Sequence, residues 1–111
     1  MVQGMDVAFR VEPDESAPRR FRLHGELDMA SSAALFDSIA PVARGGGDLE
    51  LDIRQLAFTD SSGIRTFILL ADQLRAGASL ILANPSAAVR NTLTLVGLGR
   101  AGNIEITDGK G

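Results

Sequence analysis

DLELDIRQLAFTDSSGIRTFILLADQLRAG, residues 48–77, changes its hydrophobic period in the middle. Over residues 48–58 apolar and polar side chains alternate, which predicts a strand with one buried face. Over residues 61–76 apolar side chains return about every 3.6 residues, which predicts an amphipathic helix that Gly77 ends. The side chains predicted to face the core from this helix are Ile64, Phe67, Ile68, Ala71 and Leu74. The stretch therefore predicts a central strand that leads directly into a helix.

Four further strands are predicted on either side of this stretch from short runs of apolar residues. They cover residues 5–11, 19–28, 79–85 and 103–108. Residues 12–18, EPDESAP, are rich in turn formers and predict a turn between the first two strands. Gly25 lies within the second predicted strand and is expected to end it or to form a bulge.

Two further helices are predicted from apolar residues at helical spacing. In the first, residues 29–47, Ser31 or Ser32 can cap the start, and Pro41 is expected to shorten or kink the helix before a glycine run ends it. Its predicted core residues are Ala30, Ala34, Leu35, Ile39 and Val42. The other helix begins at a Ser86 cap, and two glycines end it. Its predicted core residues are Val89, Leu93 and Val96.

The predicted order of elements is β-β-α-β-α-β-α-β. Strands joined through helices are normally parallel, with right-handed crossovers. We therefore expect an α/β fold with a mostly parallel sheet of about four to five strands and helices packed mainly on one face. The 111 residues fit a single domain, 1–111, with an ordered core at about residues 5–108 and looser ends.

Composition and charge exclude several classes of protein. A hydrophobic fraction of 45% and a net charge of −3 argue against a disordered chain and against a nucleic-acid binder. The absence of cysteine excludes disulfides, thiolate catalysis and zinc–thiolate sites. No apolar run reaches the roughly 20 residues that span a bilayer, and no signal peptide is evident. We therefore expect a cytoplasmic protein that neither binds nucleic acid directly nor inserts into a membrane.

The usual catalytic and cofactor motifs are missing from the sequence. The single histidine, His24, lies on a predicted strand, and the G-x-S-x-G pattern of hydrolases does not occur. A Ser-His-Asp site using His24 stays open as the last alternative. No phosphate-binding loop occurs, and the glycines within residues 97–102 follow a helix, which excludes a dinucleotide fingerprint. Asp28, Asp52 and Asp60 lack a metal-ligand spacing, so we expect no enzyme, no cofactor and no metal site.

Asp60, Ser61, Ser62 and Gly63 stand where the central strand passes into its helix. The first N–H groups of a helix lack partners and the helix dipole makes that end positive, so an aspartate or serine here can act as a cap. The same position suits a phosphoserine, which carries about −1.5 to −2 charges at pH 7 and would repel a negatively charged partner. The junction is therefore either a helix cap or a chemical switch.

The face of this helix opposite its apolar stripe is predicted to be polar. It carries Ser62, Thr66, Leu69 and Gln73, with Arg65 beside them. A single exposed leucine is ordinary in a soluble protein. Beside a switchable serine, Leu69 can also contact a partner.

Three stretches resemble STAS domains and, within that family, the bacterial anti-sigma factor antagonists. GELDMASSAAL, residues 25–35, is similar to the family's Gly-x-(Leu/Ile)-Asp motif after the second strand. LDIRQLAFTDSSGI, residues 51–64, resembles the phosphoacceptor segment, with its Asp-Ser-(Ser/Thr)-Gly-(Leu/Ile) motif. LTLVGLG, residues 93–99, resembles the end of the third helix. The resemblance covers nearly the whole chain in the family's order, and its second stretch is the most specific.

The resemblance implies a regulator that acts by binding. Such antagonists bind an anti-sigma factor that is also a serine kinase of histidine-kinase-like ATPase fold, and binding frees a sigma factor. Phosphorylation of the first serine of the motif, here Ser61, switches the antagonist off, and a PP2C-type phosphatase reverses it. Ser62 and Thr59 are alternative acceptors. The implied partner-binding residues are Asp28, Asp60, Ser61, Ser62, Gly63, Arg65, Thr66 and Leu69.

Departures from the family pattern concern Arg65 and the C-terminal part of the chain. Arg65 stands where many members have a small residue or glycine, one turn after Ser61, where its charge can pair with a phosphate. Ala101 and Gly102 replace larger residues before the last strand, and the tail after that strand is short.

Two other functions use the same fold. A STAS subunit of a membrane ABC transporter, for example for lipids, docks onto an ATPase subunit and needs no reversible hydroxyl, so the Asp-Ser-Ser-Gly motif favours the antagonist. A stressosome-type scaffold usually carries an extra N-terminal domain. Co-purification with a transporter ATPase would favour the docking subunit.

Overall fold

The computed structural model describes residues 9–108, which form two consecutive strands followed by three helices that alternate with three further strands. The elements are β1 (Phe9–Pro13), β2 (Arg20–Leu27), α1 (Met29–Ala43), β3 (Leu49–Thr59), α2 (Ser61–Gln73), β4 (Leu80–Ala83), α3 (Ala87–Leu95), the short 3₁₀ helix η2 (Leu98–Arg100) and β5 (Ile104–Thr107). The predicted order β-β-α-β-α-β-α-β is confirmed. The predicted start of the first strand and the ends expected to be loose lie outside the described residues.

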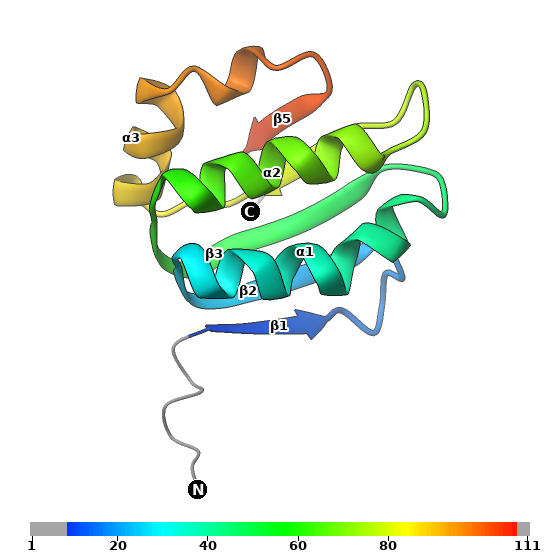
Figure 1. Ribbon diagram of the computed structural model, residues 1–111, viewed down its shortest axis with the longest axis horizontal. Helices are drawn as coiled ribbons and strands as arrows, with labels where there is room; N and C mark the ends of the chain where they lie inside the picture. The colour runs from blue at the N-terminus through cyan, green and yellow to red at the C-terminus, as the bar shows by residue number, and fades with distance from the viewer. Residues whose placement is uncertain (1–8, 109–111) are drawn as a thin grey trace, which may run out of the picture.

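The strands form one sheet in the order β1-β2-β3-β4-β5. β1 pairs antiparallel with β2, and the other three pairs are parallel, as strands joined through helices require. Each crossover moves one strand along the sheet, so right-handed connections keep the helices on one face. Figure 1 shows α1 and α2 side by side across this face, with α3 beside the end where α2 begins. The predicted α/β fold with a mostly parallel sheet is confirmed.

The hydrophobic core lies between the sheet and these helices. β3 supplies its middle, because every inward side chain of its first half is fully buried. The largest buried side chains are Leu23, Leu27, Leu35, Ile39, Leu49, Leu51, Ile53, Leu56, Phe67, Leu70, Leu80 and Leu82. Alternation in the strands therefore identified the core face correctly.

The buried arc of α2 differs from the predicted stripe. Ile64, Phe67 and Ala71 are buried as predicted, but Ile68 is 41% exposed, and Thr66, predicted on the polar face, is 6% exposed. α1 packs along one side of α2 and shifts the buried arc toward the side that carries Thr66 and the fully buried Leu70. The predictions for Ile68 and Thr66 were therefore wrong.

The ends of the other two helices also differ from prediction. α1 is capped by Asp28 and not by Ser31 or Ser32, and Pro41 sits on an exposed side of its last turn without breaking it. Ala30 and Ala34, predicted in its core, are exposed. In α3, Val89 and Leu93 are buried as predicted, but Val96 is 55% exposed because the helix ends at Leu95 and the chain turns away.

Gly25 marks a bulge in β2. Its φ of 100° lies in the left-handed region that favours glycine, and the pairing with β3 shifts register between Gly25 and Glu26. β2 continues past this bulge to Leu27, where it pairs with Thr59. Of the two expectations for Gly25, the bulge is confirmed and the strand end is not.

Candidate functional site

Two helix starts meet at the carboxyl ends of β2 and β3. The last paired residues of these strands are Leu27 and Thr59, and the Asp60 N–H donates to the Leu27 carbonyl at 3.2 Å. Asp28 and Asp60 follow directly and cap α1 and α2. Parallel pairing therefore brings together two aspartates that lie far apart in the sequence.

Asp60 organises the first turn of α2. Its Oδ1 accepts hydrogen bonds from the Ser62 N–H at 2.9 Å, the Gly63 N–H at 3.2 Å and the Ser62 hydroxyl. These hydrogen bonds hold the pKa of Asp60 below its ordinary value, and the bond from the Ser62 hydroxyl has the largest effect. The nearby charge of Asp28 opposes this shift. The cap that the sequence predicted at this junction is thus present.

Asp28 forms a capping box with Ser31 at the start of α1. Its carboxylate accepts from the Ser31 N–H at 3.0 Å, and the Ser31 hydroxyl accepts from the Asp28 N–H at 2.8 Å. Hydrogen bonds from Ser31 lower the pKa of Asp28, and the bond from the Ser31 N–H has the largest effect. Ser31 therefore contributes at the third helical position and not as the cap itself.

The three candidate phosphoacceptors differ in their surroundings. Thr59 is 4% exposed, and its hydroxyl donates to the Asp60 carbonyl at 3.3 Å. Ser62 is half-buried, bonded to Asp60 and 3.5 Å from the Ser32 hydroxyl. Ser61 is exposed, and its hydroxyl makes no hydrogen bond to any residue within 9–108. Ser61 is therefore the accessible and unengaged hydroxyl of the three.

Gly63 is required by close packing of α2 on the sheet. A Cβ at this position would lie 2.1 Å from Thr59 Oγ1 and 2.8 Å from Leu27 Cδ2. Gly63 and Thr66 are both buried, whereas Arg65 and Leu69 are exposed. Of the predicted partner-binding residues on α2, two therefore pack inside the fold and two lie on its surface.

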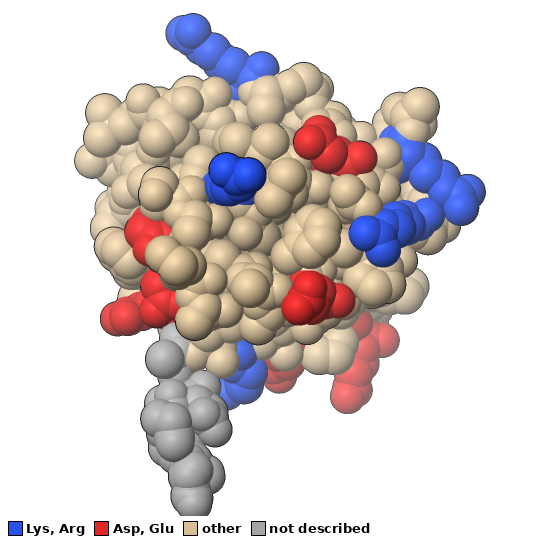
Figure 2. Space-filling model, in the orientation of Figure 1, with Lys and Arg blue, Asp and Glu red and all other residues tan. Residues whose placement is uncertain are grey.

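Two exposed apolar side chains beside these residues were missed by the sequence reasoning. Met29, 77% exposed, follows Asp28, and Phe58, 47% exposed, precedes Thr59. Their positions next to the two capped junctions are the signal that could have found them. Figure 2 shows acidic and basic side chains spread over the helix-covered face, with uncharged side chains between them. Around Ser61 this surface includes the exposed Asp28 and Arg65 as well as these apolar side chains.

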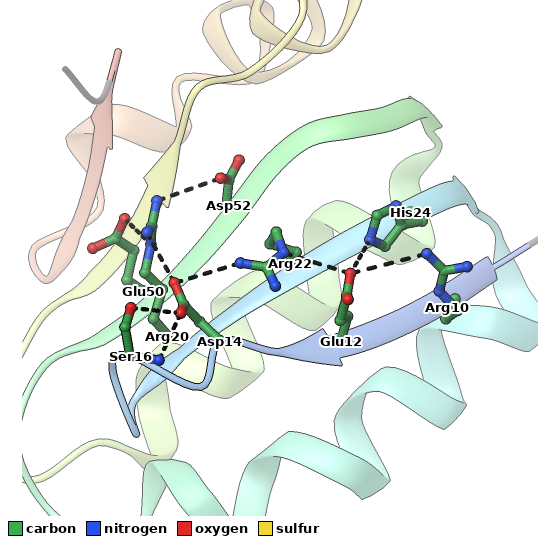
Figure 3. Close-up of polar contacts among 9 residues, drawn as sticks. All are labelled: Arg10, Glu12, Asp14, Ser16, Arg20, Arg22, His24, Glu50 and Asp52. Atoms are coloured by element: carbon green, nitrogen blue, oxygen red, sulfur yellow. Dashed lines mark hydrogen bonds and ion pairs between the residues drawn. The ribbon is translucent and has the colours of Figure 1, made fainter. Parts of the chain in front are cut away.

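The opposite face of the sheet carries a network of charged side chains instead (Figure 3). Arg20 bonds Glu50 at 2.9 Å, Asp14 at 3.0 Å and Asp52 at 3.4 Å. His24 Nε2 lies 2.9 Å from Glu12, which also pairs with Arg22 at 3.5 Å. His24 thus has a carboxylate partner on the open face of the sheet and no contact with Ser61.

The described part of the chain has a shallow groove but neither a metal-binding cluster nor a membrane-spanning helix. A shallow groove of about 440 Å³ lies at the amino ends of β2 and β3, away from Ser61. It is lined by Ala17, Pro18, Arg19, Arg20, Asp48, Glu50 and Ile81. Among residues 9–108, no three His, Cys, Asp or Glu side chains gather to hold a metal ion. Nor does any helix within those residues have the length and apolar character to cross a membrane.

A family model and a relative of known description match this chain in sequence. The family model described as "Mlab, STAS domain" matches residues 12–107. The anti-sigma-B factor antagonist of Bacillus subtilis (strain 168) is 29% identical over 75 residues, which are 67% of this chain and 69% of the relative.

Solved structures show the same fold. The anti-sigma factor antagonist SpoIIAA in its unphosphorylated form has a TM-score of 0.70 at 28% identity, covering 92% of this chain and 90% of that one. The Bacillus cell fate determinant SpoIIAA in the phosphorylated form has a TM-score of 0.62 at 24% identity, covering 92% and 93%. With its family match, its five-stranded sheet and its capped serine junction, the chain belongs to the STAS-domain family, and within it is similar to the anti-sigma factor antagonists.

Proposed function

We propose that the protein is an anti-sigma factor antagonist that is switched by phosphorylation of Ser61. One observation carries the proposal: Ser61 is exposed and unengaged, whereas the neighbouring hydroxyls of Thr59 and Ser62 are occupied by Asp60. The similarity to relatives named as antagonists supports the same reading. The proposed role is regulation by binding in the bacterial cytoplasm, without an enzymatic activity or a cofactor of its own.

In the proposed cycle, the unmodified protein binds an anti-sigma factor that is also a serine kinase, and this frees the sigma factor. The surface for this contact is the region around Ser61, where Met29, Arg65 and Leu69 are exposed. Asp28 and Asp60 hold the two helix starts in place beneath it. Methionine and arginine are enriched in protein–protein interfaces, so exposed Met29 and Arg65 suit a protein partner.

Phosphorylation would reverse the binding through charge. The kinase transfers the γ-phosphoryl group of ATP to Ser61 Oγ, with ADP as the leaving group and release of the hydroxyl proton. The added charge, about −1.5 to −2, lies beside Asp28 and Asp60 and must lose its water when a partner covers it. Because the Ser61 hydroxyl makes no bond to the rest of residues 9–108, the fold does not depend on it. A PP2C-type phosphatase would restore the binding form.

The proposal is tested by mapping phosphate on the protein purified from its own host. Wild type is expected to carry a single phosphate on Ser61, lost in Ser61→Ala and kept in Ser62→Ala, the matched control. Ser61→Asp is expected to lose binding to the copurifying anti-sigma kinase, and Ser61→Ala to keep it. Unmodified wild-type protein under all growth and stress conditions would contradict the switch.

A second candidate function is a docking subunit of a membrane ABC transporter, for example for lipids. It is favoured by the family match, whose description is "Mlab, STAS domain" and does not mention an antagonist. Under this alternative the protein copurifies with a transporter ATPase subunit, and Ser61→Asp does not respond as a switch. Binding measured against both kinds of ATPase partner separates the two candidates.

A further inference from the structure

Arg65 is the single basic residue of α2, and it is exposed. Arg20 and Arg22 on the sheet, by contrast, are already paired with carboxylates. Arg65 forms no ion pair with another residue in the part of the chain that the structure describes. Its guanidinium is therefore available to a new negative charge.

The spacing on α2 places Arg65 and Ser61 on the same face of the helix. Residues four apart on a helix lie on one face, with their Cβ atoms about 5–6 Å apart. The other helical neighbours of Arg65, three or four residues away, are Ser62, Ile68 and Leu69. None of them is a carboxylate, so none of these neighbours competes with a phosphate on Ser61 for this cation.

Apart from Arg65, the immediate surroundings of Ser61 provide few free hydrogen-bond donors for a phosphate. The Ser62 and Gly63 N–H groups donate to the Asp60 carboxylate, at 2.9 Å and 3.2 Å, and the Ile64 N–H donates to the Asp60 carbonyl at 3.1 Å. Three of the backbone donors that commonly bind an anion at a helix start are thus in use. The carboxylates of Asp28 and Asp60 add like charge nearby, so a phosphate here needs a cation.

We propose that Arg65 binds the phosphate of phosphorylated Ser61, an inference that rests on the proposed modification of Ser61. Its planar guanidinium can form paired N–H···O bonds to a phosphate, which are stronger than bonds between neutral groups. The pairing would draw the Arg65 side chain back along α2. Phosphorylation would then change two side chains of the partner-binding surface at once: Ser61 gains charge, and Arg65 no longer reaches a partner.

The test uses the full chain with phosphoserine incorporated at position 61 by genetic code expansion, so that no kinase is needed. The second pKa of the phosphate, ordinarily about 6, is titrated by phosphorus NMR. A neighbouring cation favours the doubly charged form, so the phosphate pKa is expected to rise by about 0.2–0.4 unit in Arg65→Gln. That difference should shrink at about 1 M salt, where the Debye length is about 3 Å.

Arg54→Gln is the matched control, because Arg54 is also an exposed arginine and lies on β3, outside the proposed surface. It should leave the phosphate pKa at the wild-type value. Equal phosphate pKa values in the wild-type, Arg65→Gln and Arg54→Gln proteins would overturn the role of Arg65. That result would leave the proposed switch standing, whereas the absence of phosphate on Ser61 in the native host would contradict the switch.

Discussion

Among the first five residues of α2, some pack against the sheet and others face solvent. Gly63 packs against Thr59 and Leu27, while Ser61 and Arg65 face solvent. Successive residues of a helix point about 100° apart, so one turn can hold the sheet on one side and present a modification site on the other. The tight packing beneath Ser61 keeps its position defined in both proposed states.

Gly63→Ala is expected to lower the free energy of unfolding by about 1–3 kcal/mol, the usual cost of overpacking a core. The new Cβ would lie 2.1 Å from Thr59 Oγ1, so the helix or the strand must move. Urea denaturation measures the change. Gly102→Ala is the control, since nothing lies within 4 Å of a Cβ there. Equal stability of the two variants would show that the first turn of α2 adapts without cost.

The connection between α1 and β3 depends on a side chain from outside both elements. Arg19, just before β2, donates to the carbonyls of Val42 at 2.7 Å, Asp48 at 2.9 Å and Gly47 at 3.0 Å. The last carbonyls of a helix lack intrahelical partners, so Arg19 completes the end of α1 as Asp28 completes its start. The glycine-rich turn after α1 is thereby tied to the sheet.

Arg19→Ala is expected to lower the free energy of unfolding by about 1–3 kcal/mol, the range for losing hydrogen bonds made by a charged group. Amide hydrogen exchange over residues 43–48 should become faster, because those carbonyls lose their shared donor. Arg54→Ala, which removes an exposed arginine side chain from β3, serves as the control. Unchanged exchange in Arg19→Ala would mean that the turn holds its shape without this side chain.

The whole molecule has two unlike sheet faces. Helices α1 and α2 bury one face, and the other carries the ion pairs of β1, β2 and β3 shown in Figure 3. Among residues 9–108, hydrogen bonds to the charged form lower the pKa of four carboxyl groups, two in this network and two at the helix caps. These groups are Glu12, Asp14, Asp28 and Asp60, with the largest cause from His24, Ser16, Ser31 and Ser62 respectively.

Acid is therefore expected to destabilise the protein. Unfolded carboxyl groups titrate at about 3.9 for Asp and 4.3 for Glu, above the lowered pKa values in the folded state, so the unfolded chain takes up protons first as the pH falls. The free energy of unfolding should be level above about pH 5 and fall between about pH 4 and pH 2.

Urea denaturation across this pH range checks the expectation. Asp60→Asn should show a smaller fall than wild type, because asparagine still accepts hydrogen bonds at the cap but does not titrate. Asp37→Asn, on an exposed position of α1, is the control and should follow wild type. A fall in Asp60→Asn as large as that of wild type would contradict the contribution of the Asp60 charge.

The sequence by itself determined the order of elements, the strand face turned to the core and the helix start at Ser61. These depend on side-chain direction along a local backbone, which repeats every two residues in a strand and about every 3.6 in a helix. Ala30, Ala34 and Ile68 were misplaced, because helical spacing defines an apolar arc but not which part of it a neighbouring element covers. Val96 was misplaced because α3 ends before it.

Only the tertiary structure decided which groups meet. It brought Asp28 beside Asp60, engaged Ser62 and left Ser61 free, and placed Arg19 at the end of α1. The charged network on the open sheet face likewise joins residues of three strands. Contacts of this kind depend on strand pairing and on helix packing between segments distant in the chain, and no local repeat in the sequence encodes them.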